Sequence, residues 1–189
     1  MRQRLYLIQL PLQIECLSYN RKKKKVKRME YTIRNAQAGD LPRILEIYAC
    51  ARRFMAETGN PNQWGKTNPP RQTLEADIEH RNLYVVVREQ TICGVFFFAM
   101  GEDPTYDNIC DGTWESDAPY GTIHRIASDG SGGIFGACLD HCLQITRHLR
   151  IDTHHDNKVM QHVVEKHGFS RRGIIYIADG SPRIAYERT

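Results

Sequence analysis

The chain has 189 residues, 41% of them hydrophobic, which is enough for one domain with its own core. The formal net charge is +4, but residues 1–28 carry nine Lys/Arg against one acidic residue and contribute +8, which leaves −4 for the rest. The basic character therefore belongs to the N-terminal segment, and we expect no nucleic-acid binding by residues 29–189.

Residues 1–28 end in a basic run, Arg21–Arg28, directly before Met29. Their apolar run, Leu5–Ile14, is interrupted by polar residues and proline, so it is a poor membrane span and a poor signal peptide. The basic run could be a nuclear-localisation or polyanion-binding patch. The interpretation we favour is that Met29 is the native start, with 1–28 a basic leader or translated upstream sequence and 29–189 a cytoplasmic domain without a membrane anchor.

The six cysteines form no CxxC pair and no disulfide-framework spacing. Most lie in apolar stretches, which predicts reduced, buried thiols. Cys138 and Cys142 are four residues apart on a predicted helix, but no further ligands follow at a metal-binding spacing. Because no HExxH spacing is present either, the prediction includes no metal.

The first half of the domain alternates between helical and strand periodicity. Asp40 and Thr73 each precede an apolar helical pattern and are predicted N-caps. Residues 103–119 are acidic and irregular. The elements predicted before residue 120 are a strand at 31–35, helices at 40–59 and 73–80, a loop at 59–70, and a hairpin of strands 83–88 and 92–100.

A glycine-rich turn at 129–133 dominates the second half. Glycines let backbone N–H groups approach a ligand, and the following helix adds the positive end of its dipole, so an anion such as phosphate is expected there. The flanking elements are a strand at 120–128, a helix at 134–147, a strand at 149–153, a helix at 157–169 and a hairpin of 174–178 with 183–186. The whole pattern predicts a single mixed α/β domain.

The glycine turn alone is a weak motif, because it matches neither the nucleotide-hydrolysing P-loop nor the dinucleotide fingerprint. Together with its neighbours it resembles the GNAT acetyltransferase superfamily over Met29–Thr189. The family's pyrophosphate loop, R/Q-x-x-G-x-G/A, falls on Gly130–Phe135, and Asn157, Met160 and Glu165–Phe169 resemble its following segment. Further similarity is to small bacterial members that share the segments QW (63–64), PYG-IHRIAS (within 114–128), RIDTHxDN (150–157) and DGSPRIAY (179–186).

This resemblance implies a mostly antiparallel sheet of about seven strands flanked by about four helices, with the fourth and fifth strands splayed. It also implies acetyl-CoA as cosubstrate: the glycine loop would hold the pyrophosphate, the strand end at 126–128 would pair with the pantetheine arm, and two residues of the next segment would flank it. The implied cofactor-binding residues are Ile126, Ala127, Ser128, Asp129, Gly130, Ser131, Gly132, Gly133, Ile134, Phe135, Gly136, Asn157 and Met160.

The chain departs from the family pattern at three positions. Gly130 replaces the loop's first Arg/Gln, and Phe135 replaces its last Gly/Ala. Val164 stands where the family has the Tyr that protonates the departing thiolate. Because a thiolate with a free pKa of about 8.5 is a tolerable leaving group, the missing acid is expected to lower the rate more than to forbid reaction.

Three residues are candidate catalytic groups: His124, Asp152 and His154. His124 lies two residues before Ile126 and can titrate near neutral pH. Asp152 and His154 alternate along a strand and share one face, where they could form an acid-oriented histidine or a proton path. Two of them also fit a structural role: His124 hydrogen-bonded within the strand pair, and Asp152 in a strand-end polar network that fixes Arg125 or Arg150.

Two tryptophans in polar loops, Trp64 and Trp114, are candidates for an acceptor-binding wall together with Tyr120; loop anchoring is the alternative. The acidic loop at 102–117 would favour a cationic amine, although a solvated acidic surface explains it as well. The predicted function is N-acetylation of a small-molecule or peptide amine by direct attack on acetyl-CoA. A CoA-binding sensor or interaction module without turnover is the alternative, and a homodimer is left open.

Overall fold

The computed structural model describes residues 30–189, so the predictions made for the leader lie outside the described residues. Four α-helices, two short 3-10 helices (η1 and η2) and seven strands alternate along this part of the chain. In order they are β1 (Thr32–Asn35), η1 (Ala38–Asp40), α1 (Leu41–Glu57), α2 (Arg71–Glu79), β2 (Leu83–Arg88), β3 (Thr91–Met100), η2 (Pro104–Tyr106), β4 (Gly121–Ser128), α3 (Ile134–Cys142), β5 (Leu149–Thr153), α4 (Lys158–Lys166), β6 (Ser170–Tyr176) and β7 (Pro182–Arg188).

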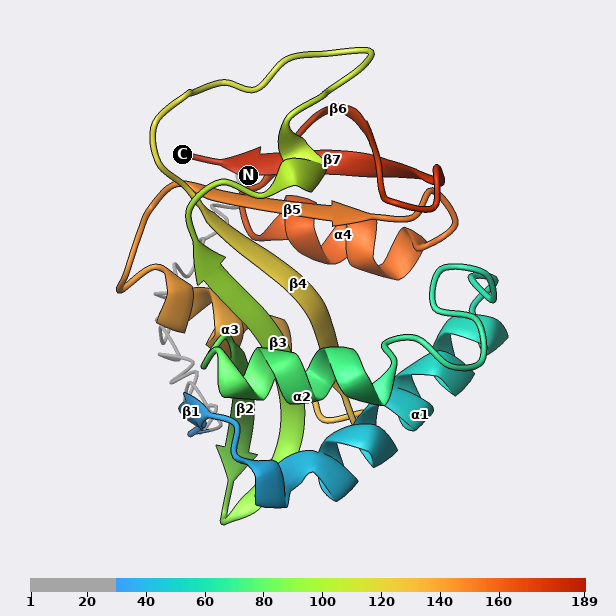
Figure 1. The fold of residues 1–189 in the computed structure, drawn as a ribbon, viewed down its shortest axis with the longest axis vertical. Helices are drawn as coiled ribbons and strands as arrows, with labels where there is room; N and C mark the ends of the chain where they lie inside the picture. The colour runs from blue at the N-terminus through green and yellow to red at the C-terminus, as the bar shows by residue number, and fades with distance from the viewer. Residues whose placement is uncertain (1–29) are drawn as a thin grey trace, which may run out of the picture.

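The seven strands form one sheet in the order β1-β2-β3-β4-β5-β7-β6. Every neighbouring pair is antiparallel except β4 and β5, which are parallel. That parallel pair is in register only at Gly121↔Leu149 and Thr122↔Arg150, after which the two strands diverge (Figure 1). The predicted mixed sheet with splayed fourth and fifth strands is confirmed.

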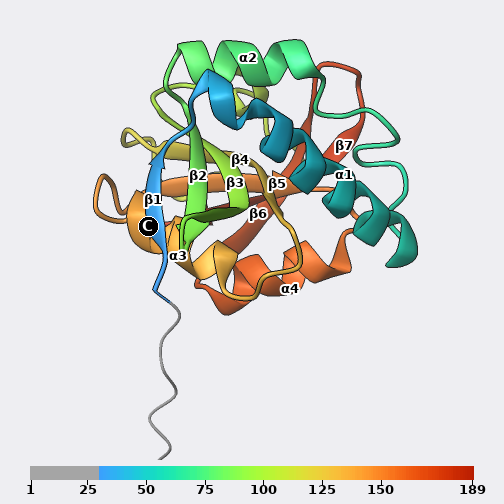
Figure 2. The same ribbon diagram turned by 90° about the horizontal axis from the view of Figure 1, so that it is seen from below.

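The helices cover both faces of the sheet. Figure 2 shows α1 and α2 on one face and α3 and α4 on the other. Each face has its own apolar core: Ile44, Ile47 and Tyr48 of α1 are fully buried on the first, and Cys138 and Val164 are buried on the second. Each helix pair and the core beneath it form one layer of the fold. The splay between β4 and β5 lies where these two layers meet.

A bulge in β4 changes the direction of the strand at the start of the splay. Val95 of β3 pairs with Ala127 and Phe97 with His124, which leaves an extra residue in β4, and Arg125 has φ 51°. Its guanidinium ion-pairs with Asp77 of α2 at 2.7 Å, and the Tyr48 hydroxyl donates to its carbonyl at 2.8 Å. The bulge is thus fixed by both helices of the first layer.

Several element boundaries differ from the sequence prediction. α2 begins at Arg71 with Pro70 at the N-cap position, so Thr73 is not the cap. Asp40 is at the N-cap of α1 but makes no side-chain cap; its carboxylate accepts hydrogen bonds from Arg34 and from the Gln37 amide.

The predicted helix 134–147 ends at Cys142, because the amides of Gln144 and Ile145 bond three residues back and turn the chain. Ile145, expected on the buried face, is 50% exposed. β6 begins at Ser170, four residues earlier than predicted. The free thiols of Cys93, Cys138 and Cys142 are buried as predicted, but Cys110 is exposed.

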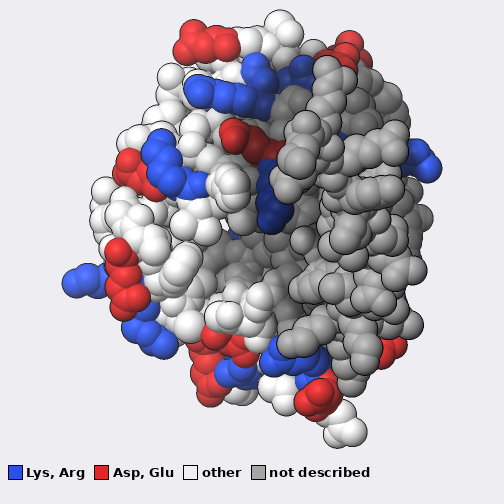
Figure 3. All heavy atoms as spheres, turned by 180° about the vertical axis from the view of Figure 1, so that it is seen from behind, with Lys and Arg blue, Asp and Glu red and all other residues white. Residues whose placement is uncertain are grey.

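No helix within residues 30–189 combines the length and the apolar character needed to cross a bilayer. On the rear of the molecule, the part formed by described residues carries basic and acidic side chains interspersed (Figure 3).

Candidate active site

A cleft of about 710 Å³ opens between β4 and β5 and extends from the glycine loop to the loop after α1. Its walls come from both layers of the fold: α1 and the 63–73 segment on one side, the glycine loop and α4 on the other. Among the residues that line it are Phe54, Met55, Trp64, His124, Ile126, Ser128, Gly133, Phe135, Asp152, Thr153, Asn157, Met160 and Arg183.

The glycine loop closes one end of the cleft. Gly133 takes the left-handed conformation, φ 80°, at the N-cap of α3, and the first amides of this helix carry its positive dipole end. Asp129 shapes the loop: one carboxylate oxygen accepts from the Ser131 amide at 3.1 Å, and the other pairs with Arg43 at 2.7 Å. Arg43 also donates to the carbonyl of Ile92, which ties the loop to β3. The negative charge of Asp129 beside the loop is therefore compensated.

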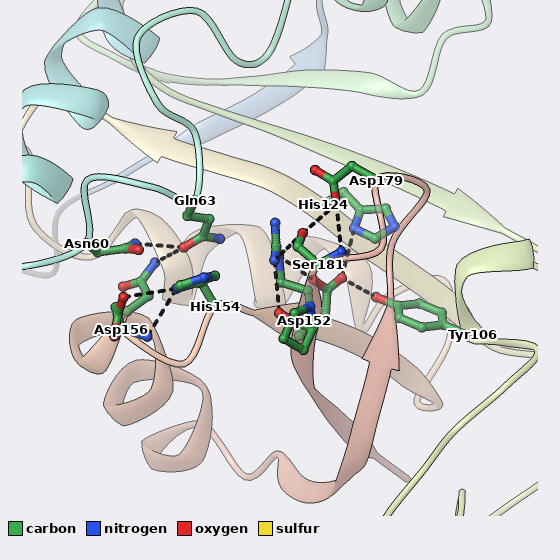
Figure 4. Close-up of polar contacts among 12 residues, drawn as sticks. Asn60, Gln63, Tyr106, His124, Asp152, His154, Asp156, Asp179 and Ser181 are labelled. Carbon is green, nitrogen blue, oxygen red and sulfur yellow. Dashed lines mark hydrogen bonds and ion pairs between the residues drawn. The ribbon is translucent and has the colours of Figure 1, made fainter.

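The start of α4 forms the next part of the wall. Asn157 caps this helix through Oδ1, which accepts from the Met160 amide at 3.0 Å. Its Nδ2 donates to Gln63 Oε1 at 2.8 Å, and Asn60 donates to the same oxygen at 2.7 Å. Figure 4 shows Asn60 and Gln63 reaching toward this side from the loop after α1. The two layers thus meet across the cleft through the side chain of Gln63.

At the other side of the cleft, His124 lies between two carboxylates. Its Nε2 is 2.8 Å from Asp103 Oδ2, and its Nδ1 is 3.4 Å from Asp152 Oδ1. Tyr106 donates its hydroxyl proton to the same Asp152 oxygen at 3.0 Å (Figure 4). With Nε2 donating to Asp103, a neutral His124 turns the Nδ1 lone pair toward Asp152, and the position between these two groups is open to one proton.

The surroundings shift the pKa values of two of these groups. Burial works to raise the pKa of Asp103, but hydrogen bonds from His124 and from Thr105 outweigh it and hold that pKa well below its usual range. Burial, together with the nearby charge of Asp152, raises the pKa of Tyr106 well above its ordinary value. Tyr106 therefore stays protonated and acts as a donor, while Asp103 stays ionised.

Arg183, at the start of β7, completes the polar wall. Its side chain is 7% exposed, and its Nε lies 4.0 Å from Asp152 Oδ2, beyond hydrogen-bond distance. Nη1 donates to the Ser181 hydroxyl and to the Pro182 carbonyl, each at 2.9 Å. Within residues 30–189, its Nε and Nη2 donate no hydrogen bond.

The structure brings most of the predicted cofactor residues to the cleft, but three of them, Asp129, Gly132 and Gly136, are not part of its lining. Of the predicted catalytic residues, His124 and Asp152 come together. His154 is buried outside the lining, and its Nδ1 accepts from the Asp156 amide at 3.2 Å. Burial and the neighbouring His155 lower the pKa of His154.

His154, His155 and Asp156 also place potential metal-ligand atoms within 4.8 Å of one another. The His155 ring is exposed, and its Nε2 pairs with Asp156 at 2.9 Å. The contacts of Asp156 with His154 and His155 explain why these three side chains lie together in the polar turn before α4.

Of the three aromatic residues predicted to bind the acceptor, one lines the cleft and two lie outside its lining. Trp64 lines the cleft and packs edge-on against Tyr48, with ring centroids 5.5 Å apart. Trp114 and Tyr120 lie outside the lining: the Trp114 indole donates to the Tyr106 carbonyl at 3.0 Å, and the Tyr120 hydroxyl accepts from the Asp103 amide at 3.2 Å. Both hold η2 and its flanks, and so support the position of Asp103 beside His124.

Sequence reasoning missed four side chains of the site: Gln63, Asp103, Tyr106 and Arg183. Asp103 was visible only as one member of an acidic loop, and Tyr106 only as an aromatic within it. The residues Asp179–Pro182 have the composition of a turn, but nothing in their pattern indicates that the next residue faces a cleft. Gln63 precedes Trp64 in a polar loop, where a single glutamine carries no signal of a contact with α4.

α4 presents no proton donor to the cleft. Its lining residues are Val159, Met160 and Val163. Val164, at the position of the family's tyrosine, is 1% exposed and packs in the core of the second layer. Thr153 of β5 does line the cleft, and its buried Oγ1 has no hydrogen-bond partner among the described residues. This hydroxyl is enclosed and is not exposed to the cleft.

A mixed sheet with one splayed parallel pair, a helix N-terminus at one end of the cleft and polar side chains at the other defines an acyltransferase-type architecture. No protein-family model and no curated protein matches the sequence. Solved structures do match, and they place the chain in the GNAT acetyltransferase superfamily.

A GNAT-family acetyltransferase from Streptococcus agalactiae 2603 has a TM-score of 0.74 and 28% identity, over 84% of this chain and 94% of its own. A GNAT-family acetyltransferase from Listeria monocytogenes 4b F2365 has a TM-score of 0.63 and 16% identity, over 85% and 95%. A ribosomal-protein-alanine N-acetyltransferase from Brucella melitensis has a TM-score of 0.55 and 16% identity, over 83% and 98%. The last two show likeness of fold alone, and the first supports acetyl transfer as the general activity.

Proposed function

We propose that the protein transfers the acetyl group of acetyl-CoA to the amine nitrogen of an acceptor by direct attack in a ternary complex. The observation that carries this proposal is the continuous cleft from the glycine loop to the pair His124 and Asp152. Its two ends supply different chemistry, anion binding at one and proton acceptance at the other, which this reaction requires together.

The residues at the loop end fit a CoA pyrophosphate. Gly130 has φ 101° and open space where a Cβ would stand, and the amides that open α3 point toward the same region. Arg43 neutralises Asp129, which removes a repulsion that the phosphates would otherwise meet. The strand end at 126–128, Asn157 and Met160 would flank the pantetheine arm. Bound acetyl-CoA supplies the acetyl group as a reactive thioester.

The polar wall would accept the proton that the attacking amine loses. Asp103 holds His124 Nε2, so the exchangeable proton position lies between His124 Nδ1 and Asp152. Tyr106 donates to Asp152 and fixes the orientation of its carboxylate. The pair can therefore take up one proton without a movement of either side chain.

The departing thiolate receives no proton from α4, because the side chains that line the cleft there are apolar. Protonation of the thiolate would then be completed by solvent, as its moderate basicity allows.

The proposal is tested by release of free CoA from acetyl-CoA with a panel of amines. Asp152→Asn keeps the size of the side chain but removes the proton acceptor, so we expect kcat to fall by about 10²- to 10³-fold. Asp107→Asn, an exposed position in the same acidic loop as Asp103, is the matched control and should leave kcat unchanged.

No CoA release above blank with any amine would contradict the proposal. Calorimetry with CoA then separates the remaining cases. Binding without turnover would indicate a CoA-binding module, and no binding would exclude both functions.

A further inference from the structure

Among the described residues that line the cleft, Arg183 is the basic side chain that has no carboxylate within hydrogen-bond distance. Arg125 also lines the cleft but pairs with Asp77 at 2.7 Å, and His124 is held by Asp103 at 2.8 Å. Arg183 is almost fully buried, yet the nearest Asp152 oxygen lies 4.0 Å from its Nε. A buried guanidinium is stabilised by bidentate contacts to an anion, and this one leaves two donor nitrogens unused.

Strand geometry places Arg183 and Asp152 on one face of the sheet. Asp152 pairs with Ala185 of β7, and Thr153 pairs with Ile184. Side chains alternate along a strand, so Arg183, two residues before Ala185, is on the same side as Asp152. Figure 4 shows Asp152, His124 and Tyr106 converging beside the Asp179–Ser181 turn that precedes β7. The free donors of Arg183 therefore face the part of the cleft that contains the proton acceptor.

A carboxylate and a guanidinium side by side complement a ligand that carries both an amine and a carboxylate. The amine would lie at Asp152 and His124, where it loses its proton, and the carboxylate would accept from Nε and Nη2 of Arg183. In an α-amino acid these two groups are attached to one carbon, which suits neighbours as close as Asp152 and Arg183. Phe54, Met55 and Trp64 line the same cleft and offer apolar contact for the side chain.

We propose that the acceptor is a free α-amino acid with an apolar side chain, and that Arg183 selects it by binding its carboxylate. This inference rests on the proposed acetyl transfer. It distinguishes a free amino acid from a peptide N-terminus and from a simple amine, since neither of those carries a carboxylate on the carbon next to the amine.

The test measures kcat/KM with acetyl-CoA and the twenty common L-amino acids, and then with the carboxamide and the decarboxylated amine of the best one. Wild-type protein should prefer the amino acid over both analogues by on the order of 100-fold, the effect of losing a buried charge-assisted pair. Arg183→Met should remove that preference, because kcat/KM should fall far more for the amino acid than for the decarboxylated amine. Arg183→Lys keeps the charge but not the planar fork, and should be intermediate.

CoA affinity and the thermal midpoint of each variant show whether it is folded, because the CoA contacts lie at the other end of the cleft. Two results would overturn the inference and leave the proposed function standing. One is equal use of amino acid, amide and amine by the wild type, and the other is equal loss for all three in Arg183→Met with CoA affinity intact. Failure to release CoA with any amine would overturn the proposed function, and the inference with it.

Discussion

At the residue scale, the site depends on how three charged groups share protons. Asp103, His124 and Asp152 lie in a row, and the pKa of Asp103 is the one that its surroundings lower strongly. Asp103 contributes no atom to the cleft lining, so it acts through His124 as a positioning residue. Its ionised state fixes the ring by holding Nε2.

This lowered pKa makes part of the stability dependent on pH. A carboxyl whose folded pKa is depressed stabilises the folded state above its unfolded pKa, about 3.9, and this contribution disappears as pH falls toward the folded pKa. We expect Asp103→Asn to lower the unfolding free energy by about 1.5–3 kcal/mol at pH 7, the value of a hydrogen bond to a charged group. The difference from wild type should shrink below about pH 4.

Urea unfolding of both proteins between pH 7 and pH 3 measures the effect, with Asp117→Asn, an exposed position of the same loop, as control. A deficit in Asp103→Asn that stays constant over this range would show that charge does not cause it.

At the element scale, the position of α3 depends on a glycine in the neighbouring strand. Gly94 of β3 lies beneath Ile134, the first residue of α3, and a Cβ at Gly94 would stand 2.6 Å from Ile134 Cγ2. Cγ2 is attached directly to the branched Cβ, so it cannot move away without moving the helix start. The absence of a side chain at Gly94 thus sets how closely the N-terminus of α3 approaches the sheet.

We expect Gly94→Ala to displace the start of α3, to destabilise the protein by about 1–3 kcal/mol as overpacking does, and to weaken CoA binding several-fold. Gly39→Ala is the control, because a Cβ there meets no atom within 4 Å. Urea unfolding and calorimetry with CoA measure the two effects. If Gly94→Ala bound CoA as tightly as the Gly39→Ala control, the geometry of this helix start would not govern the site.

Elements and loop types could be predicted from the sequence because periodicity and turn residues are local signals. The limits of α3 could not: Ile145 continues the apolar spacing, but the chain turns after Cys142 and leaves it exposed. The contact between Asp103 and His124 spans 21 residues. Whether an acidic residue in an irregular loop meets solvent or a histidine depends on tertiary packing, here through Trp114 and Tyr120, and periodicity carries no such information.

At the scale of the whole molecule, the cleft exists because two independently packed layers share one sheet that parts in the middle. α1 and α2 close one core, α3 and α4 close the other, and β4 with β5 remain in register only at their first residues. Gln63 joins the layers across the opening by its contact with Asn157. A ligand that fills the cleft would contact both layers and add contacts that the free protein lacks.

Such a ligand should stabilise the fold as a whole. Acetyl-CoA or CoA at about 100 times its Kd raises the unfolding free energy by about 2.7 kcal/mol, which for a chain of this size moves Tm by several degrees. Pantetheine has no pyrophosphate and should produce little shift at the same concentration, because the glycine loop and the N-terminus of α3 would lack their ligand.

Ser131→Glu places a negative charge in that loop, so it should abolish the shift given by CoA while leaving the Tm of the free protein close to that of wild type. Thr113→Glu, which adds the same charge at an exposed position away from the cleft lining, should keep the full shift. Thermal unfolding with each ligand decides the matter. A negative charge next to bound pyrophosphate must repel the phosphates. An undiminished Tm shift in Ser131→Glu, or an equal Tm shift with pantetheine, would therefore show that the pyrophosphate does not bind at the glycine loop.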